Sequence, residues 1–132
     1  MAEEGLVTVP SAHGVGDTLA RLHDEIVAAG MTVFAQVDHA AGAASVGMDL
    51  RPTTVVMFGS PKGGTPLMAD NQTAGIDLPL KVLVWEDAAG RVLVSYNDPH
   101  WIARRHGIGA GADAAVDAMA AGLSRLTAQA TQ

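Results

Sequence analysis

The chain contains no cysteine and few aromatic side chains: two Phe, two Trp and one Tyr among 132 residues. Without cysteine it cannot hold a disulfide framework, a thiolate-bound iron–sulfur cluster or zinc ion, or a thiol nucleophile. Basic residues are also scarce, since eight Lys and Arg stand against 14 Asp and Glu and give a formal net charge of −6. Because nucleic acids attract cationic surfaces, this balance predicts no nucleic-acid partner.

Long apolar runs are missing as well. No stretch approaches the roughly 20 apolar residues that a membrane-spanning helix needs. The N-terminal residues 1–5 carry two acidic side chains and no basic one, which is not the pattern of a signal peptide. We therefore expect no membrane partner and a cytoplasmic location. A length of 132 is that of one ordinary domain, so residues 1–132 are predicted to form a single domain.

What the chain does contain is small apolar side chains, with 48% apolar residues and a further 15 glycines. Alternating or β-branched runs predict five strands, at 6–9, 31–37, 53–58, 80–87 and 91–96. Helical stripes predict two long helices, one opening near Asp17 and ending at Gly30 and one over residues 111–128, with a frayed end at 128–132. Shorter helices are expected at 38–47 and 98–107, a loop at 59–66 and a helical turn at 67–71.

The second predicted strand also predicts where its side chains point. In the second strand, strict alternation puts Met31, Val33, Ala35 and Val37 on one face and Thr32, Phe34 and Gln36 on the other.

The order of the predicted strands and helices gives the fold class. Because the last two strands are joined by a short hairpin, this order predicts an α+β fold with a mostly antiparallel sheet. We expect the two long amphipathic helices to cover one face of that sheet.

Five short segments follow one another at characteristic spacing. They are Asp38-His39-Ala40, Leu50-Arg51-Pro52-Thr53, Phe58-Gly59-Ser60-Pro61, Asp77-Leu78-Pro79-Leu80-Lys81 with Val84-Trp85-Glu86-Asp87, and Arg105-His106-Gly107. Over about residues 6–127, this set resembles the bacterial and archaeal family catalogued as domain of unknown function 302. The resemblance implies a curved antiparallel sheet in a β-α-β4-α plan of the TATA-binding-protein-like kind. It also implies a homodimer but no particular reaction, and the family usually has Asn where this chain has Ser60.

The few basic residues gather in or beside these segments. This clustering favours a domain that binds a small anionic or amphipathic ligand in a cleft between the sheet and the helices, without catalysis. The ligand-binding candidates are His39, Arg51, Lys81, Arg104 and His106. This hypothesis requires no cofactor and no metal.

Two alternatives remain open from the residues alone. The first is a metal-assisted hydrolase or lyase that uses His39 and His106 as ligands or general base. The second is a structural or dimeric interaction module with no small ligand. In that module Asp38 caps a helix, and the cluster 104–106 complements a helix C-terminus.

Two further patterns invite a functional interpretation. Residues 59–65 follow a strand and hold glycines, Lys62 and Thr65, but in a phosphate-binding loop the lysine follows the glycines and a helix comes next. Here Pro66 comes next, so a surface turn or a loop over a ligand cleft is favoured. Trp85 and Tyr96, on neighbouring strands, serve either as core anchors or as an aromatic wall for a ligand.

Overall fold

The computed structural model describes residues 4–132; residues 1–3, on which the expectation of no signal peptide partly depends, lie outside the described residues. The strands are β1 (Leu6–Pro10), β2 (Thr32–Asp38), β3 (Thr53–Gly59), β4 (Leu80–Glu86) and β5 (Val92–Asn97). The α-helices are α1 (Val15–Ala28), α2 (His39–Ser45), α3 (Pro61–Asp70), α4 (Pro99–Arg105) and α5 (Asp113–Thr131). Two 3-10 helices, η1 (Gln72–Ile76) and η2 (Ala110–Ala112), lie between them.

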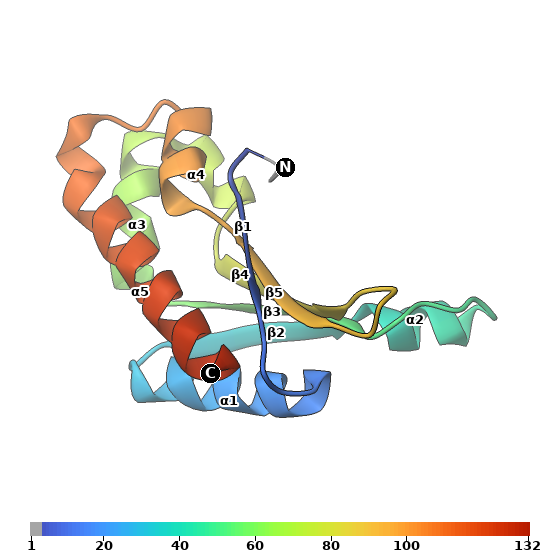
Figure 1. Ribbon diagram of the computed structural model, residues 1–132. Helices are drawn as coiled ribbons and strands as arrows, with labels where there is room; N and C mark the ends of the chain where they lie inside the picture. Colours follow the sequence, from blue (N-terminus) through green and yellow to red (C-terminus); the bar gives the residue numbers. More distant parts are fainter. Residues whose placement is uncertain (1–3) are drawn as a thin grey trace.

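All five strands form one sheet in the order β1-β5-β4-β3-β2, and every neighbouring pair is antiparallel. The predicted α+β class and the β-α-β4-α plan are therefore confirmed, with α2, α3 and α4 as additions in the connections. Figure 1 shows α1 and α5 beside the sheet, and α2 at the far end of the molecule from α3, α4 and α5. The chain folds as a single domain around one core.

The core lies between one face of the sheet and the two long helices. Alternate residues of β3 and β4, such as Val56, Phe58 and Val82, are fully or almost fully buried. They join one apolar cluster with Leu22 of α1 and Leu123 of α5. Burying a side chain of this size contributes about 1.5–3 kcal/mol, so this contact positions both helices on the sheet.

The opposite face of the sheet carries the residues between these positions. Trp85 lies there, half-buried, and its Nε1 donates to Ser95 Oγ at 2.9 Å. Tyr96, in contrast, is buried on the helix side, where it pairs across the sheet with Val82. The two aromatic side chains therefore stand on opposite faces, and the aromatic wall that their neighbouring strands suggested does not form.

The alternation predicted for the second strand is wrong from Phe34 onward. Val33 pairs with Phe58 and Ala35 with Met57, so Phe34 is an extra residue that makes a β-bulge. Val33 packs against the core, whereas Ala35 and everything beyond it change faces. A period-2 pattern cannot reveal a bulge, because one inserted residue reverses the facing of all that follow.

The loop predicted at 59–66 is also wrong, since α3 begins at Pro61. Ser60 caps this helix through its Oγ, which accepts from the Gly63 N–H at 3.3 Å, and Pro61 occupies the first turn, where a missing N–H costs nothing. Asn is an equally good N-cap residue, which gives a physical reason for the Asn that the resemblance places at this position. The helical turn expected at 67–71 is the last part of α3.

Both long helices differ from their expected bounds. The first begins at Val15 with Gly14 as N-cap, so Asp17 lies in its first turn. The last continues to Thr131, which is buried. Its end is held because the Ala12 N–H donates to the Thr131 carbonyl at 2.8 Å and the His13 ring lies 2.6 Å from the Gln132 carbonyl. These contacts across the chain explain why the predicted fraying is wrong.

Residues 38–52 form a projection, here called the arm, that carries α2 away from the core (Figure 1). Asp38 caps α2 as predicted, accepting from the Ala41 N–H at 2.9 Å. Nothing in α2 is buried, and Val46 and Met48 beyond it are 71% and 65% exposed. Among residues 4–132, no helix combines the length and the apolar character that crossing a membrane requires.

Candidate functional site

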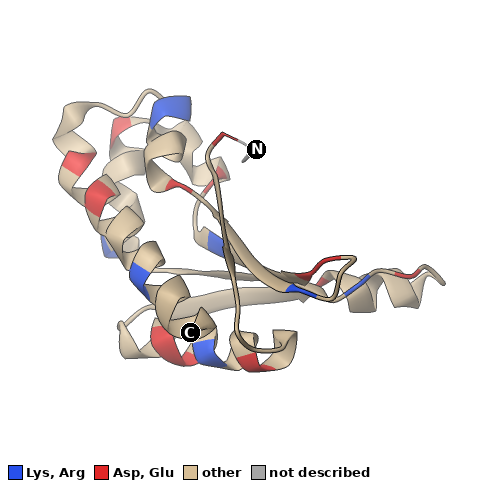
Figure 2. Cartoon of the chain, in the orientation of Figure 1, with Lys and Arg blue, Asp and Glu red and all other residues tan. Residues whose placement is uncertain are grey.

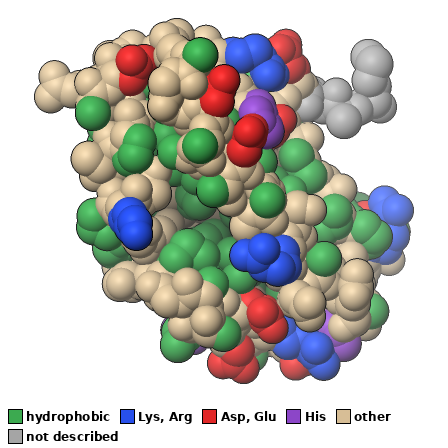
Figure 3. All heavy atoms as spheres, turned by 90° about the vertical axis from the view of Figure 1, so that its left-hand side faces the viewer, with side chains coloured by type: hydrophobic (Ala, Val, Ile, Leu, Met, Phe, Trp, Pro, Cys, Tyr) green, Lys and Arg blue, Asp and Glu red, His purple; other side chains and the backbone are tan. Residues whose placement is uncertain are grey.

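A cavity of about 640 Å³ opens on the helix side of the sheet, between α3 and α5. Figure 3 shows it as a hollow of apolar side chains with basic side chains at its rim. Its volume falls in the range of small-molecule sites, roughly 300–1,000 Å³. The residues that line it are Met31, Phe34, Gly59, Ser60, Pro61, Lys62, Gly63, Gly64, Thr65, Met68, Leu78, Pro79, Leu80, Ala115, Ala118, Met119, Gly122, Leu123 and Leu126.

The wall from α5 explains why space is left there. Ala115, Ala118 and Gly122 recur at helical spacing and therefore share one face of the helix. A Cβ added at Gly122 would meet no atom within 4 Å, so this position looks into open space. The cavity is thus formed largely by side chains that are too small to fill it.

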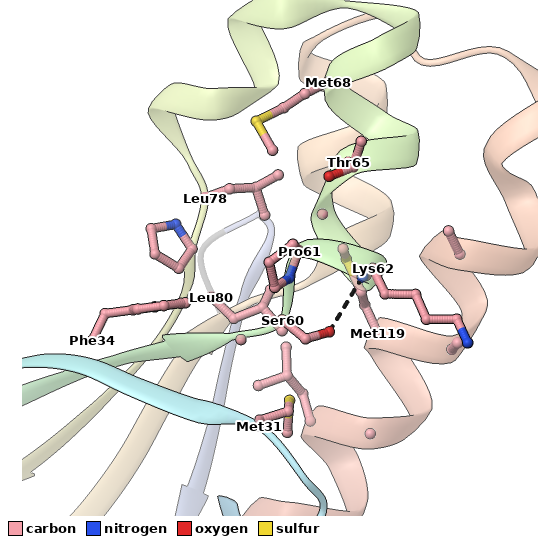
Figure 4. A pocket seen from close by; sticks show the side chains of 18 of the residues that line it. Met31, Phe34, Ser60, Pro61, Lys62, Thr65, Met68, Leu78, Leu80 and Met119 are labelled. Atoms are coloured by element: carbon pink, nitrogen blue, oxygen red, sulfur yellow. Dashed lines mark hydrogen bonds between the residues drawn. The ribbon is translucent and has the colours of Figure 1, made fainter.

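The opposite wall comes from the first turns of α3 and from residues 78–80 (Figure 4). A Cβ at Gly64 would lie 3.5 Å from Leu78 Cδ1 and from Met68 Cε, so the α3 backbone packs closely on this wall. Phe34, the bulged residue of β2, closes the side near Gly59 and remains 53% exposed. The bulge therefore supplies an aromatic ring to the rim of the cavity.

The chemistry of the lining is apolar and adaptable. Met31 directly precedes β2, Met68 belongs to α3 and Met119 to α5, and unbranched methionine side chains fit irregular apolar surfaces. Ser60 and Thr65 supply hydroxyl groups. Lys62 is the one charged side chain among the lining residues of the described chain, 4–132. Such a surface suits a ligand with an apolar body.

The structure does not bring the five predicted site residues to this cavity. His39 is exposed at the start of α2, and Arg51 is exposed on the arm, where its Nε donates to the Glu86 carbonyl at 3.2 Å. Lys81 alternates with buried Leu80 and Val82 and so faces the other side of the sheet. Figure 2 shows the basic residues spread over the molecule. Their role in ligand binding stays a prediction.

Arg104 is exposed on α4, whereas His106, at the end of that helix, is buried in a polar cluster. Its Nε2 donates to Asp77 Oδ2 at 2.6 Å, and its Nδ1 lies 2.9 Å from Thr73 Oγ1. Arg105 donates to both oxygens of Asp77, at 3.1 and 2.9 Å. Two of the five segments that carry the family resemblance, 77–81 and 105–107, thus contact each other. Leu78, which follows Asp77, lines the cavity.

The metal-assisted alternative required His39 and His106 to act together. His39 belongs to α2 and His106 follows α4, elements that stand at opposite ends of the molecule in Figure 1. One ion cannot reach both. Within residues 4–132, no group of three His, Asp or Glu side chains is arranged to hold a metal.

Among residues 4–132, three groups have displaced pKa values, and none of them lines the cavity. Hydrogen bonds that the His100 ring donates to the carboxylates of Asp117 and Asp98 raise the pKa of His100, which joins α4 to α5. The backbone N–H of Arg91 is the main cause that lowers the pKa of Asp87 in the β4–β5 turn. Burial raises the pKa of Tyr96. These shifts arise from local pairing and burial, so they do not mark the cavity as a catalytic centre.

Sequence reasoning missed most of the cavity residues. One signal is present in the sequence: the glycine-rich segment before Pro66 allows a loop over a ligand cleft, and residues 59–65 line the cavity. The small-residue face of α5 was a second signal that the apolar stripe of that helix obscured. The methionines gave no signal, since methionine is common in any core.

A family model and a solved structure point to the same family. The family model described as "Domain of unknown function DUF302" matches residues 7–126. The crystal structure of an uncharacterised conserved DUF302 protein from Bacillus stearothermophilus superposes with a TM-score of 0.86 over 97% of this chain and 99% of that one, at 17% identity. At that identity the likeness is one of fold.

Curated relatives share more of the sequence. Proteins named fluoride-specific ion channel FluC 1, from Brucella suis and Brucella abortus, are 46% identical over 125 residues, or 95% of this chain. The matched part is 49% and 46% of those proteins. The chain therefore spans about half the length of the curated relatives it matches, and their name refers to the whole proteins.

Proposed function

We propose that this chain, which belongs to the DUF302 family, is a binding domain for a small amphipathic molecule whose apolar part enters the cavity between α3 and α5. The observation that carries the proposal is the cavity itself: about 640 Å³, open to solvent and lined almost wholly by apolar side chains. Empty apolar surface of this kind costs free energy, and a ligand that covers it recovers that cost. The expected site of action remains the cytoplasm.

The sequence segments that carry the family resemblance support the same location. Residues 59–61 belong to one of these segments and residues 78–80 to another, and both line the cavity. A third segment, at 105–107, reaches the site indirectly, because Arg105 and His106 bind Asp77 immediately before the cavity wall. Part of the resemblance thus surrounds the cavity, whereas the segments at 38–40 and 50–53 lie on the arm or beside it.

Binding fits the site better than catalysis does. The cavity lining offers two hydroxyls and one lysine but no carboxylate or imidazole, within residues 4–132, to act as a general base. Its hydroxyl nearest the strand end, Ser60 Oγ, is engaged as the cap of α3. An arrangement with an apolar interior and a polar rim is typical of carriers and sensors of small molecules.

Filling the cavity should abolish binding without unfolding the protein. Replacement of Gly122 by Phe places a ring in the open space of the cavity. It also removes a glycine from the interior of a helix, where glycine is about 1 kcal/mol less favourable than alanine. We expect the fluorescence enhancement of N-phenyl-1-naphthylamine, a neutral apolar probe, to be saturable with the unaltered protein and at least tenfold weaker with Gly122→Phe. Thermal denaturation should show an unchanged or higher Tm.

Gly16→Phe is the matched control. Gly16 also has no atom within 4 Å of its added Cβ, lies in α1 and does not line the cavity. It should leave probe binding unchanged. Saturable binding that survives Gly122→Phe, or an unaltered protein that does not bind the probe at all, would contradict the proposal.

We also propose that the partner implied by the resemblance, a second copy of this chain, covers the arm. The support is the exposure of Val46, Met48 and Leu50, at 71%, 65% and 50%, on a projection whose helix has no buried residue. Contiguous exposed apolar surface on a soluble domain commonly marks an interface. Two-fold dimers are the commonest assemblies that cover such a surface with its own copy.

Charges on the arm should then dissociate the dimer. We expect the double variant Val46→Glu/Met48→Glu to shift the mass measured by light scattering after size-exclusion chromatography from dimer to monomer. Ile76→Glu is the control, because Ile76 is 72% exposed and lies in η1, outside the arm. A monomer in the unaltered protein, or a dimer that persists in the double variant, would rule out this interface.

A further inference from the structure

The charge distribution around the cavity is one-sided. Lys62 is the only charged residue that lines it in the described part of the chain, although the protein as a whole has 14 acidic residues against eight basic ones. Lys62 takes part in no ion pair among residues 4–132 and is exposed at the rim. In a protein with a net charge of −6, the described residues that line the apolar cavity thus include one cation without an ion-pair partner and no acidic side chain.

The other polar groups lie on the same wall. Ser60 Oγ accepts the Gly63 N–H, so the hydrogen of that hydroxyl remains available to a further acceptor. Thr65, one turn further along α3, adds a second hydroxyl that is exposed. Figure 4 shows Ser60 at the start of α3 and Thr65 on α3, whereas Met31, Phe34 and Leu78 approach the cavity from other parts of the chain. The site therefore has a donor-rich side and an apolar remainder.

We propose that the ligand of this cavity is an amphipath with a single negative charge, an acid with an unbranched apolar chain, whose carboxylate is bound at Lys62. This inference rests on the proposed function and adds the class of head group to it. The apolar chain of the ligand lies among the methionines and against the small residues of α5, and the ligand's carboxylate accepts a hydrogen bond from the Lys62 ammonium. Lys62 is the one cation among the described residues that line the cavity, and a single cation matches one negative charge better than the two of a phosphate monoester.

The matched series decanoate, decanol and decyltrimethylammonium tests the head group, since the three share one chain and differ in charge. Each competes with N-phenyl-1-naphthylamine for the unaltered protein at low ionic strength. We expect decanoate to displace the probe at a concentration about tenfold lower than decanol, and decyltrimethylammonium to be weakest. The advantage of decanoate should shrink as salt rises, because the lysine is exposed and its field is screened.

Variants of the two lysines of the chain separate this site from a general effect of charge. Lys62→Met should remove the advantage of decanoate over decanol, and Lys62→Glu should favour decyltrimethylammonium. Lys81→Met removes the same charge from the opposite face of the sheet, outside the cavity, and should leave the order unchanged.

The outcomes distinguish the two proposals. If the probe binds and Gly122→Phe blocks it, but the three head groups compete equally or decyltrimethylammonium competes best, the cavity is a ligand site and the carboxylate inference is wrong. If Lys81→Met and not Lys62→Met removes the preference for decanoate, the anchor is misplaced. If the probe does not bind the unaltered protein, the proposed function itself fails.

Discussion

Replacement of Phe58 by alanine should lower the free energy of unfolding by about 3–5 kcal/mol, whereas the same replacement at Phe34 should cost less than about 1 kcal/mol. These are the two phenylalanines of the chain, and they sit on neighbouring strands. Phe58 is completely buried between the sheet and the helices, so its removal leaves a hole in close-packed surroundings. Phe34 is 53% exposed on its bulge, so its removal leaves little or no hole in the core.

Urea denaturation followed by circular dichroism gives both values, provided that the slope of free energy against denaturant is unchanged. The two variants should rank in the opposite order for binding. Phe34→Ala opens the rim of the cavity and should weaken binding of the neutral probe, although it scarcely changes the stability. A loss of more than about 2 kcal/mol at Phe34 would show that the ring is covered in solution.

Replacement of Asp77 by alanine should cost about 3 kcal/mol, because it leaves two cationic or polar partners without their acceptor. The Asp77 side chain is 12% exposed and accepts from Arg105 and from His106, which is itself 6% exposed. The hydrogen bonds join η1 to the end of α4, so their loss also frees the chain just before Leu78. We therefore expect probe binding to weaken as well, by a factor of a few.

Asp24→Ala is the matched control for this change. Asp24 is exposed on α1, and no hydrogen bond or ion pair joins its side chain to the rest of residues 4–132. It should alter the free energy of unfolding by no more than about 0.5 kcal/mol. Equal effects of the two substitutions in urea denaturation would mean that the Asp77 cluster adds nothing to stability.

The sheet was predictable because its signals are local. The hairpin between β4 and β5 follows from two alternating runs and from Gly90, whose φ of +82° belongs to the left-handed region. Asp98 caps α4 as the sequence predicts, accepting from the His100 N–H at 3.0 Å. The start of α3 was not predictable from propensity, since Gly63, Gly64 and Pro66 all disfavour a helix. The Ser60 cap and the packing of Leu67 in the core override that preference.

The candidate site was harder to predict, for two physical reasons. Closeness along the sequence does not give closeness in space: Lys81 follows the cavity residue Leu80 directly, but strand alternation turns it to the opposite face. The cavity itself depends on what is missing, since Ala118 and Gly122 contribute by leaving volume empty. Small residues occur both in cavity walls and in tightly packed helix contacts, so their presence in the sequence does not distinguish the two.

The pairing of β1 with β5 has a consequence for the order of events during synthesis. Thr8 and Ser95 bind each other at 2.8 Å across a sequence separation of 87 residues, and every strand contact of β1 is of this kind. At a translation rate of about 5–20 residues per second, the first strand waits roughly 4–17 s for its neighbour to be made. Until then, the β2–β3–β4 meander can assemble, while β1 stays an unpaired strand on the nascent chain. Pairing between residues so far apart in the sequence also slows refolding from denaturant. We therefore expect β1–β5 to be the last strand pair to form.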